Sequence, residues 1–271
     1  MSDYDRNVAA ADYGRPLTRA EAAVVDAGLR AYMLRIYNYM VLGLAITGFA
    51  ALGAYMVSVT GDSAAAAKAA NGAAFALRQG VYLTPIGYAL FVSPLKWVIM
   101  LAPLGLVFFL GFRAHTMRPA TAQIMFWIYA ALVGISLGVI FLIYAHTSIV
   151  RVFFITAASF GALSLWGYTT QRDLSGMGSF LVMGLFGIII ASLVNIFLAS
   201  SALQWVISVV GVLVFAGLTA WDTQRLKSEY IYGAMEGEVL ERSAIMGALS
   251  LYLDFLNLFT FLLQLLGTRE E

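Results

Sequence analysis

The chain has 271 residues, of which 61% are hydrophobic and 11% charged, and it contains no cysteine. Soluble domains are about 45–50% apolar and about 25% charged, so this chain has too few charged residues to cover a water-facing surface. The absence of cysteine excludes disulfide scaffolds, cysteine-ligated zinc sites and cysteine nucleophiles. A net charge of +1 argues against nucleic-acid binding, which requires a clustered basic excess. The composition indicates a polytopic membrane protein.

The N-terminal segment is predicted to be a cytoplasmic tail over residues 1–30. It contains arginines but no apolar run, whereas a cleavable signal peptide has a continuous apolar region. Residues 31–266 are expected to form one transmembrane domain, and residues 267–271 a short C-terminal tail. The stretch 59–94 is predicted to be the longest loop, rich in Ala, Gly and Ser, with no chemistry assigned to it.

Seven apolar stretches occur between residues 31 and 266. Each has close to the roughly 20 residues that a helix needs to cross a hydrocarbon core about 30 Å thick. Helices are required because an open strand edge in lipid leaves backbone amides unpaired. The sequence therefore predicts an all-α membrane protein, a bundle of seven transmembrane helices. The predicted spans are 36–58, 95–113, 122–145, 152–171, 179–199, 203–221 and 244–266.

The distribution of basic residues predicts the orientation of the chain. An N-terminus inside puts eleven Lys and Arg residues on the cytoplasmic side and five on the other side. The positive-inside rule then places the N-terminus in the cytoplasm and, after seven crossings, the C-terminus outside.

Asp254 is the one acidic or basic residue in the interior of a predicted span. An ionised Asp at a helix centre costs about 2.5–3.5 kcal/mol, so such a residue faces the bundle interior or water and has a partner. Ser250, Asp254, Asn257 and Gln264 are spaced so that they share one stripe of the helix. This pattern predicts that the seventh helix is central and presents a polar stripe to other helices or to a pore.

Asp222 is the expected partner of Asp254. It follows the sixth span directly, and the seventh span begins on the same side, so both carboxyl groups belong to the same half of the membrane. Two carboxylates that close cannot both ionise cheaply, so they are expected to share one proton, and its loss would leave repulsion or a place for a divalent cation. Arg113, at the inner end of the second span, is the expected counter-ion. The residues leave open a purely structural alternative, in which Asp222 caps a helix and Asp254 hydrogen-bonds within the bundle.

Three segments resemble the transmembrane Bax-inhibitor-motif family, here its bacterial members. They are Ser250-Leu-Tyr-Leu-Asp-Phe-Leu-Asn-Leu-Phe259, Ala220-Trp-Asp-Thr-Gln-Arg-Leu226 and Asn195-Ile-Phe197. The resemblance covers residues 31–266, and the seventh-span motif is its most specific part. It implies a bundle in which six helices surround a polar seventh, in a bacterial inner membrane.

The resemblance also implies a function, that of a pH-sensitive calcium-leak channel without catalytic residues or an organic cofactor. The expected partners are the lipid bilayer, calcium ions and protons, with a membrane protease complex as a further partner and no nucleic acid. One feature departs from some members, because the second span has no acidic residue between Lys96 and Arg113. The implied site comprises Asp222 and Asp254 as pH sensor and calcium ligands, Arg113 as a latch, and a supporting stripe of Ser250, Asn257, Gln264 and Asn195.

Three other readings compete with a channel. The first is a non-conducting interaction protein that modulates a membrane protease or the cell-death and stress machinery. The second is an intramembrane aspartyl protease, which the residues disfavour because Leu251-Tyr-Leu stands before Asp254 where that class has Gly-x-Gly. The third is a serine hydrolase built on Gly134-Ile-Ser-Leu-Gly138, which is disfavoured because that serine lies inside an apolar span without a histidine base.

Overall fold

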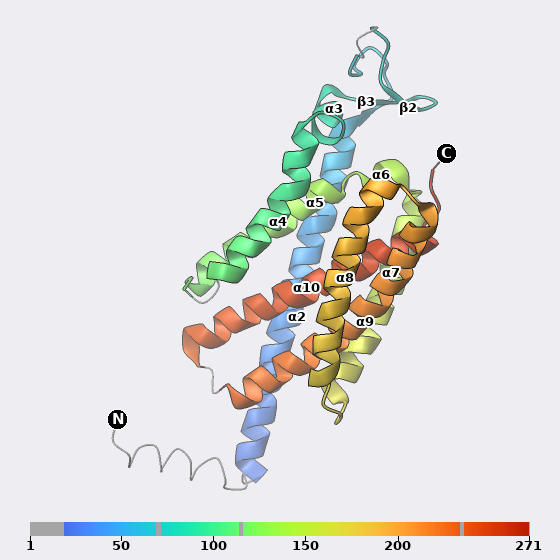
Figure 1. Cartoon of the computed structure of the whole chain (residues 1–271). Coiled ribbons are helices and arrows are strands. Elements are labelled where there is room, and N and C mark those ends of the chain that lie inside the picture. Colours follow the sequence, from blue (N-terminus) through green and yellow to red (C-terminus); the bar gives the residue numbers. More distant parts are fainter. Residues whose placement is uncertain (1–18, 69–71, 114–115, 234–235, 271) are drawn as a thin grey trace.

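The computed structural model describes residues 19–68, 72–113, 116–233 and 236–270. Within them, seven helices are long and apolar enough to cross a membrane, the third crossing being completed by the short α6 (Ile140–Ile143). The predicted fold class and number of spans are therefore confirmed (Figure 1). The long helices are α2 (Arg19–Ser58), α4 (Leu95–Arg113), α5 (Pro119–Leu137), α7 (His146–Thr169), α8 (Ser175–Leu198), α9 (Ser201–Tyr232) and α10 (Gly237–Leu266).

Two helices extend beyond their apolar stretches. α2 begins at Arg19, inside the predicted tail 1–30, while residues 1–18 of that tail lie outside the described residues. α9 continues to Tyr232, although the predicted span ended at residue 221. The two extensions pack together, since the rings of Tyr32 and Tyr230 stack with centroids 5.3 Å apart. Helix boundaries that are placed where the hydrophobic stretch ends therefore omit helical turns that are stabilised by tertiary packing.

The stretch 59–94 is more ordered than the predicted loop. It forms a small antiparallel sheet with strand order β1-β3-β2, followed by the short helix α3 (Pro85–Phe91). The side chain of Thr84 caps α3 by accepting a hydrogen bond from the amide of Gly87. These elements cover one end of α2, as Figure 1 shows. The strands are β1 (Val59–Thr60), β2 (Ala76–Arg78) and β3 (Val81–Leu83).

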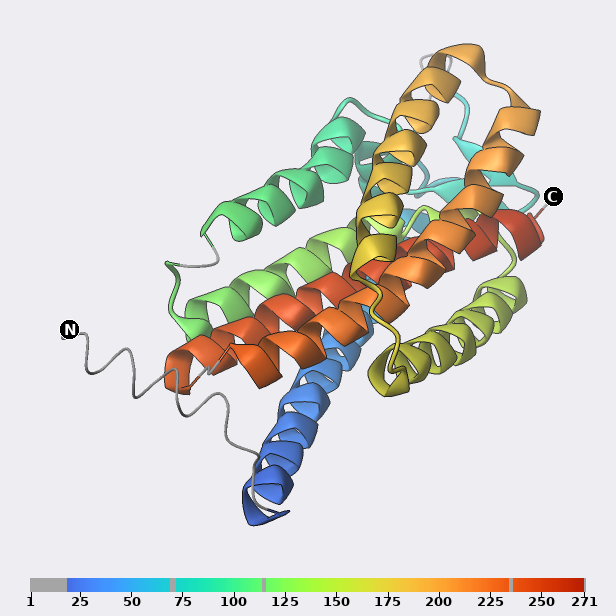
Figure 2. The same cartoon turned by 60° about the horizontal axis from the view of Figure 1, so that its bottom comes forward.

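α10 is the most buried of the seven spans. It packs directly against α9, α2, α7 and α5. α8 packs on α9, and α4 packs on α5 and α3 rather than on α10. Figures 1 and 2 both show α4 at the side of the bundle. The predicted central position of the seventh helix is therefore confirmed, with four helices in direct contact with it and two in an outer position.

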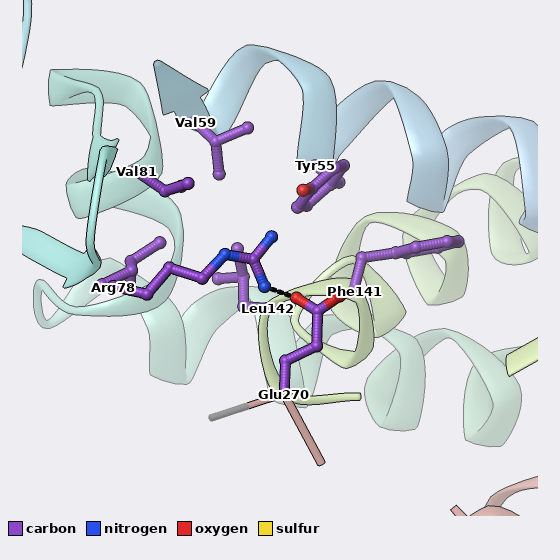
Figure 3. A pocket seen from close by; sticks show the side chains of 8 residues that line it. Tyr55, Val59, Arg78, Val81, Phe141, Leu142 and Glu270 are labelled. Carbon is purple, nitrogen blue, oxygen red and sulfur yellow. Dashed lines mark ion pairs between the residues drawn. The ribbon is translucent and has the colours of Figure 1, made fainter. Parts of the chain in front are cut away.

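The C-terminal residues fold back onto the end of the bundle that carries the small sheet. The amide of Ala145 donates to the carbonyl of Thr268, and the amide of Glu270 donates to the carbonyl of Ile143. Figure 3 shows the guanidinium of Arg78 paired with the carboxylate of Glu270 beside Tyr55 and Phe141. The C-terminal segment thus ties the loop sheet to the bundle.

Candidate functional site

The two predicted acids meet between α9 and α10. Asp222 is 6% exposed and Asp254 5% exposed, so both side chains are buried inside the spans. Their carboxyl groups contact each other through a hydrogen bond. A carboxylate can only accept, so this contact requires that one of the two groups carries a proton. The structure therefore brings together the two residues that the sequence predicted as a pair.

Arg225 provides the positive charge beside this pair. Its Nη1 atom lies 3.0 Å from Oδ1 of Asp222, three residues earlier on α9. Its Nε atom lies 3.4 Å from Oε1 of Glu229, and Nη2 donates a hydrogen bond of 3.3 Å to Oγ of Ser250 on α10. The guanidinium also lies over the ring of Trp221, 4.9 Å from its centroid. Arg225 consequently connects the pair to both helices.

Arg113 does not take the predicted position. It lies in the last turn of α4 with an exposed side chain, and no ion pair among the described residues includes it. α4 packs on α5 and α3, and among its residues Gly111 rather than Arg113 faces the space next to Arg225. Sequence reasoning missed Arg225 because it ended the sixth span at residue 221. A helix continued by one turn would have placed Arg225 at position i+3 from Asp222, where side chains meet.

The predicted polar stripe of α10 separates into two parts. Ser250 joins Arg225 near the acid pair, whereas Asn257 donates to the carbonyl of Leu253 within its own helix. Gln264 lies at the other end of α10, and its Oε1 accepts from Gln204 and from Ser208, at 2.8 Å each.

The remaining predicted residue, Asn195, belongs to this second cluster. Its Nδ2 donates to Oε1 of Gln204 at 3.1 Å, and its own Oδ1 accepts from the amide of Ser200. The cluster joins α8, α9 and α10 at the end of the bundle far from the acids. Gln204 and Ser208 were not predicted, although their i, i+4 spacing at the start of the sixth span is the signal that places them on one helix face.

A chain of hydroxyl groups leads from α2 to the neighbour of Asp222. The hydroxyl of Tyr37 on α2 hydrogen-bonds to Ser164 on α7, and Ser164 hydrogen-bonds to Thr223 on α9 at 2.9 Å. Thr223 follows Asp222 directly and is fully buried. The three helices are thus connected at the level of the acid pair by groups that both donate and accept protons.

The acid pair alone is a sparse ligand set for a metal ion. Calcium takes six to eight oxygen ligands, of which two carboxyl groups supply at most four. Within the described ranges, no group of three or more His, Cys, Asp or Glu side chains is placed to hold a metal. The Oδ2 atom of Asp254 is buried, and among the described residues it has no hydrogen-bond partner. The two carboxyl groups therefore cannot complete the coordination of a calcium ion by themselves.

Comparison with known proteins identifies the relatives of this chain. Residues 29–271 match the family described as "Bax1-I: Inhibitor of apoptosis-promoting Bax1". An uncharacterized protein of Rickettsia prowazekii is 46% identical over 263 residues, which cover 96% of this chain and 99% of that protein. The Escherichia coli inner membrane protein YbhL is 41% identical over 247 residues, which cover 90% of this chain and 94% of YbhL. An uncharacterized protein of Caulobacter vibrioides is 41% identical over 271 residues, the whole length of both chains.

Proposed function

The chain belongs to the Bax1-I family, and on this premise we propose that it is a pH-sensitive calcium-leak channel. Its seven apolar helices, with relatives named as inner membrane or membrane proteins, identify it as a multi-pass protein of the bacterial inner membrane. The proposal includes a cytoplasmic N-terminus and an external C-terminus. It includes no covalent catalysis and no organic cofactor.

The observation that carries the proposal is the buried contact between Asp222 and Asp254. With one shared proton, the two carboxyl groups attract each other and hold α9 against α10. Without that proton, two negative charges face each other in a low-dielectric interior, where their repulsion is much larger than in water. Deprotonation therefore favours separation of the two helices, and the freed carboxylates offer oxygen ligands to a passing calcium ion.

The test is calcium flux into proteoliposomes, measured against pH. For the wild type, we expect a leak that rises as the pH is raised. Asp254→Asn removes the second ionisable group and keeps the shape of the side chain, so we expect its leak to lose most of its pH dependence. Asp222→Asn should have the same effect, because either substitution removes the shared proton.

Asp173 provides a matched control at the surface. It lies between α7 and α8, where hydrogen bonds from Ser175 lower the pKa of its carboxyl group, so it stays ionised throughout the assay. Asp173→Asn should leave the pH profile of the leak unchanged. A wild type that passes no calcium at any pH would defeat the proposal, and so would an Asp254→Asn variant with the wild-type profile.

The same flux assay separates the channel from a second candidate function. The matched family is described as an inhibitor, which favours a protein that acts by binding a partner. In that case the bundle is a scaffold, and a membrane protease complex or stress machinery binds the helix ends that extend past the apolar spans, including Lys227 and Glu229. Such a protein would pass no calcium, and the aspartate variants would not change the flux.

A further inference from the structure

A cavity of about 560 Å³ lies beside the acid pair and is distinct from it. Its walls come from the last third of α9 and the first half of α10, while Gly111 of α4 contributes to the opposite side. Pockets that bind organic ligands usually measure about 300–1,000 Å³, so this cavity has the size of a ligand site. It lies between α4, which packs on α5 and α3, and the helices α9 and α10.

The polar lining of the cavity suits an anion. Arg225 enters from α9 and Arg242 from α10, so two guanidinium groups line one space. Glu229 is the one acidic residue in that lining, so the lining itself holds two basic groups and one acidic group. The hydroxyl groups of Ser243 and Ser250 also line the cavity. Guanidinium groups bind phosphate oxygens through paired, charge-assisted hydrogen bonds.

Arg225 has donors left for such a ligand. Its contacts with Asp222, Glu229 and Ser250 occupy one nitrogen each. A guanidinium has five N–H donors, so two remain beyond those three contacts. A phosphate beside Arg225 would therefore add to its present contacts without displacing Asp222.

The apolar lining favours a lipid over a soluble anion. Leu226, Val239 and Met246 alternate with the polar groups, and Val239 is 53% exposed. Leu226 is already buried in the bundle, so Val239 is the side chain that an acyl chain would cover and that an inorganic phosphate would leave exposed. Basic pockets between transmembrane helices are typical binding sites of anionic lipid headgroups. We propose that an anionic phospholipid occupies this cavity, with its phosphate between Arg225 and Arg242 and an acyl chain along the gap between α4 and α10.

The test is native mass spectrometry of the purified full chain with phosphatidylglycerol or phosphatidylcholine added. We expect one phosphatidylglycerol molecule to be retained where phosphatidylcholine is lost. Arg242→Gln should weaken phosphatidylglycerol binding by roughly tenfold, because charged hydrogen bonds are removed. Glu229→Gln should strengthen binding, because it removes the acid that lines the cavity.

Three controls make the outcome decisive. Arg172→Gln removes an exposed arginine at the same end of the bundle but outside the cavity, so its lipid binding should equal that of the wild type. Arg242→Lys keeps the charge and should retain most of the binding, whereas Met246→Trp fills the apolar part and should abolish it. Glycerol 3-phosphate carries the phosphate without acyl chains and should bind at least about tenfold more weakly.

Equal retention of the two phospholipids would overturn the proposal, as would unchanged binding in both Arg242→Gln and Met246→Trp. Binding of glycerol 3-phosphate as tight as that of phosphatidylglycerol would overturn the assignment to a lipid. The proposal does not depend on calcium conduction, so it stands or fails separately from the channel.

Discussion

Each of the three ionisable side chains at the acid pair is stabilised inside the bundle by contact with another of the three. An isolated carboxylate in the membrane is unfavourable, but Asp222 and Asp254 contact each other, and Arg225 lies 3.0 Å from Asp222. Removing one partner of a buried charge pair destabilises a protein more than replacing both partners with apolar residues. The reason is that the remaining charge stays buried without a counter-charge. We therefore expect the three side chains to act as one unit.

Arg225→Gln tests the role of the positive charge. A guanidinium beside a carboxyl group favours its ionised form, so without Arg225 the pair should hold its proton to higher pH. We expect the pH at which the calcium leak rises to be higher than in the wild type by about one pH unit or more. Arg225→Lys keeps the positive charge and should shift this pH less than Arg225→Gln does. A leak profile unchanged in Arg225→Gln would contradict this role.

At this scale, the sequence predicts the acid pair but not its surroundings. Asp254 is detectable because a single charge in an apolar span requires a partner, and Asp222 is the nearest candidate at the right depth. Arg113 was predicted as the counter-ion, whereas Arg225 lies beside Asp222; a span ended at residue 221 hides the i+3 relation of Asp222 and Arg225. The contact of Gln204 with Gln264 depends on how α9 and α10 pack against each other. The spacing of residues within one span gives no information about that packing.

At the scale of elements, small residues let the helices approach closely. A Cβ atom added to Gly134 on α5 would lie 2.5 Å from the carbonyl oxygen of Thr47 and 2.6 Å from Cβ of Ala50, both on α2. Thr47 in turn hydrogen-bonds to Tyr252 of α10 at 2.6 Å. The contact of α5 with α2 is thus coupled to the position of the helix that carries Asp254.

Gly134→Ala is expected to destabilise the bundle by roughly 1–3 kcal/mol, because α2 and α5 must move apart. Gly161→Ala on α7 is the matched control, since its added Cβ atom would meet nothing within 4 Å. Thermal unfolding in detergent should show a lower midpoint for Gly134→Ala alone. Equal midpoints for the two variants would show that this close approach contributes little.

The number and order of the spans could be predicted from hydrophobicity alone. The helical extensions of α2 and α9 could not, because their residues are too polar to be recognised by hydropathy. They form because Tyr32, Leu226 and Tyr230 pack there. Strand pairing within 59–94 was missed because its strands have only two or three residues each.

At the scale of the whole molecule, the two ends of the bundle differ. One end holds the small sheet, α3 and the C-terminal segment, which Arg78 and Glu270 tie together (Figure 3). α10 runs from the cavity, past the acid pair, to the C-terminal segment. A movement of α10 at the acid pair therefore acts on a helix whose other end is attached to the bundle. We expect this attachment to hold that end of α10 in place, so that separation of α9 and α10 occurs at the other end.

Glu270→Gln tests this attachment. Without the ion pair, the sheet should open more often, and we expect amide hydrogen exchange in residues 76–83 to accelerate about fivefold. The double variant Arg78→Glu with Glu270→Arg restores opposite charges and should recover much of the protection. If the single and double variants exchange alike, the ion pair does not hold the sheet.

The shared proton can be observed directly by infrared spectroscopy of the purified protein, through the carbonyl stretch of a protonated carboxylic acid. At neutral pH, the wild type should show this band with the intensity of one group per chain, and raising the pH should remove it. In Asp254→Asn the band should be absent at neutral pH, because Asp222 is then left with Arg225 and no second acid. A wild type without the band at neutral pH, or an Asp254→Asn variant that keeps it, would contradict the account.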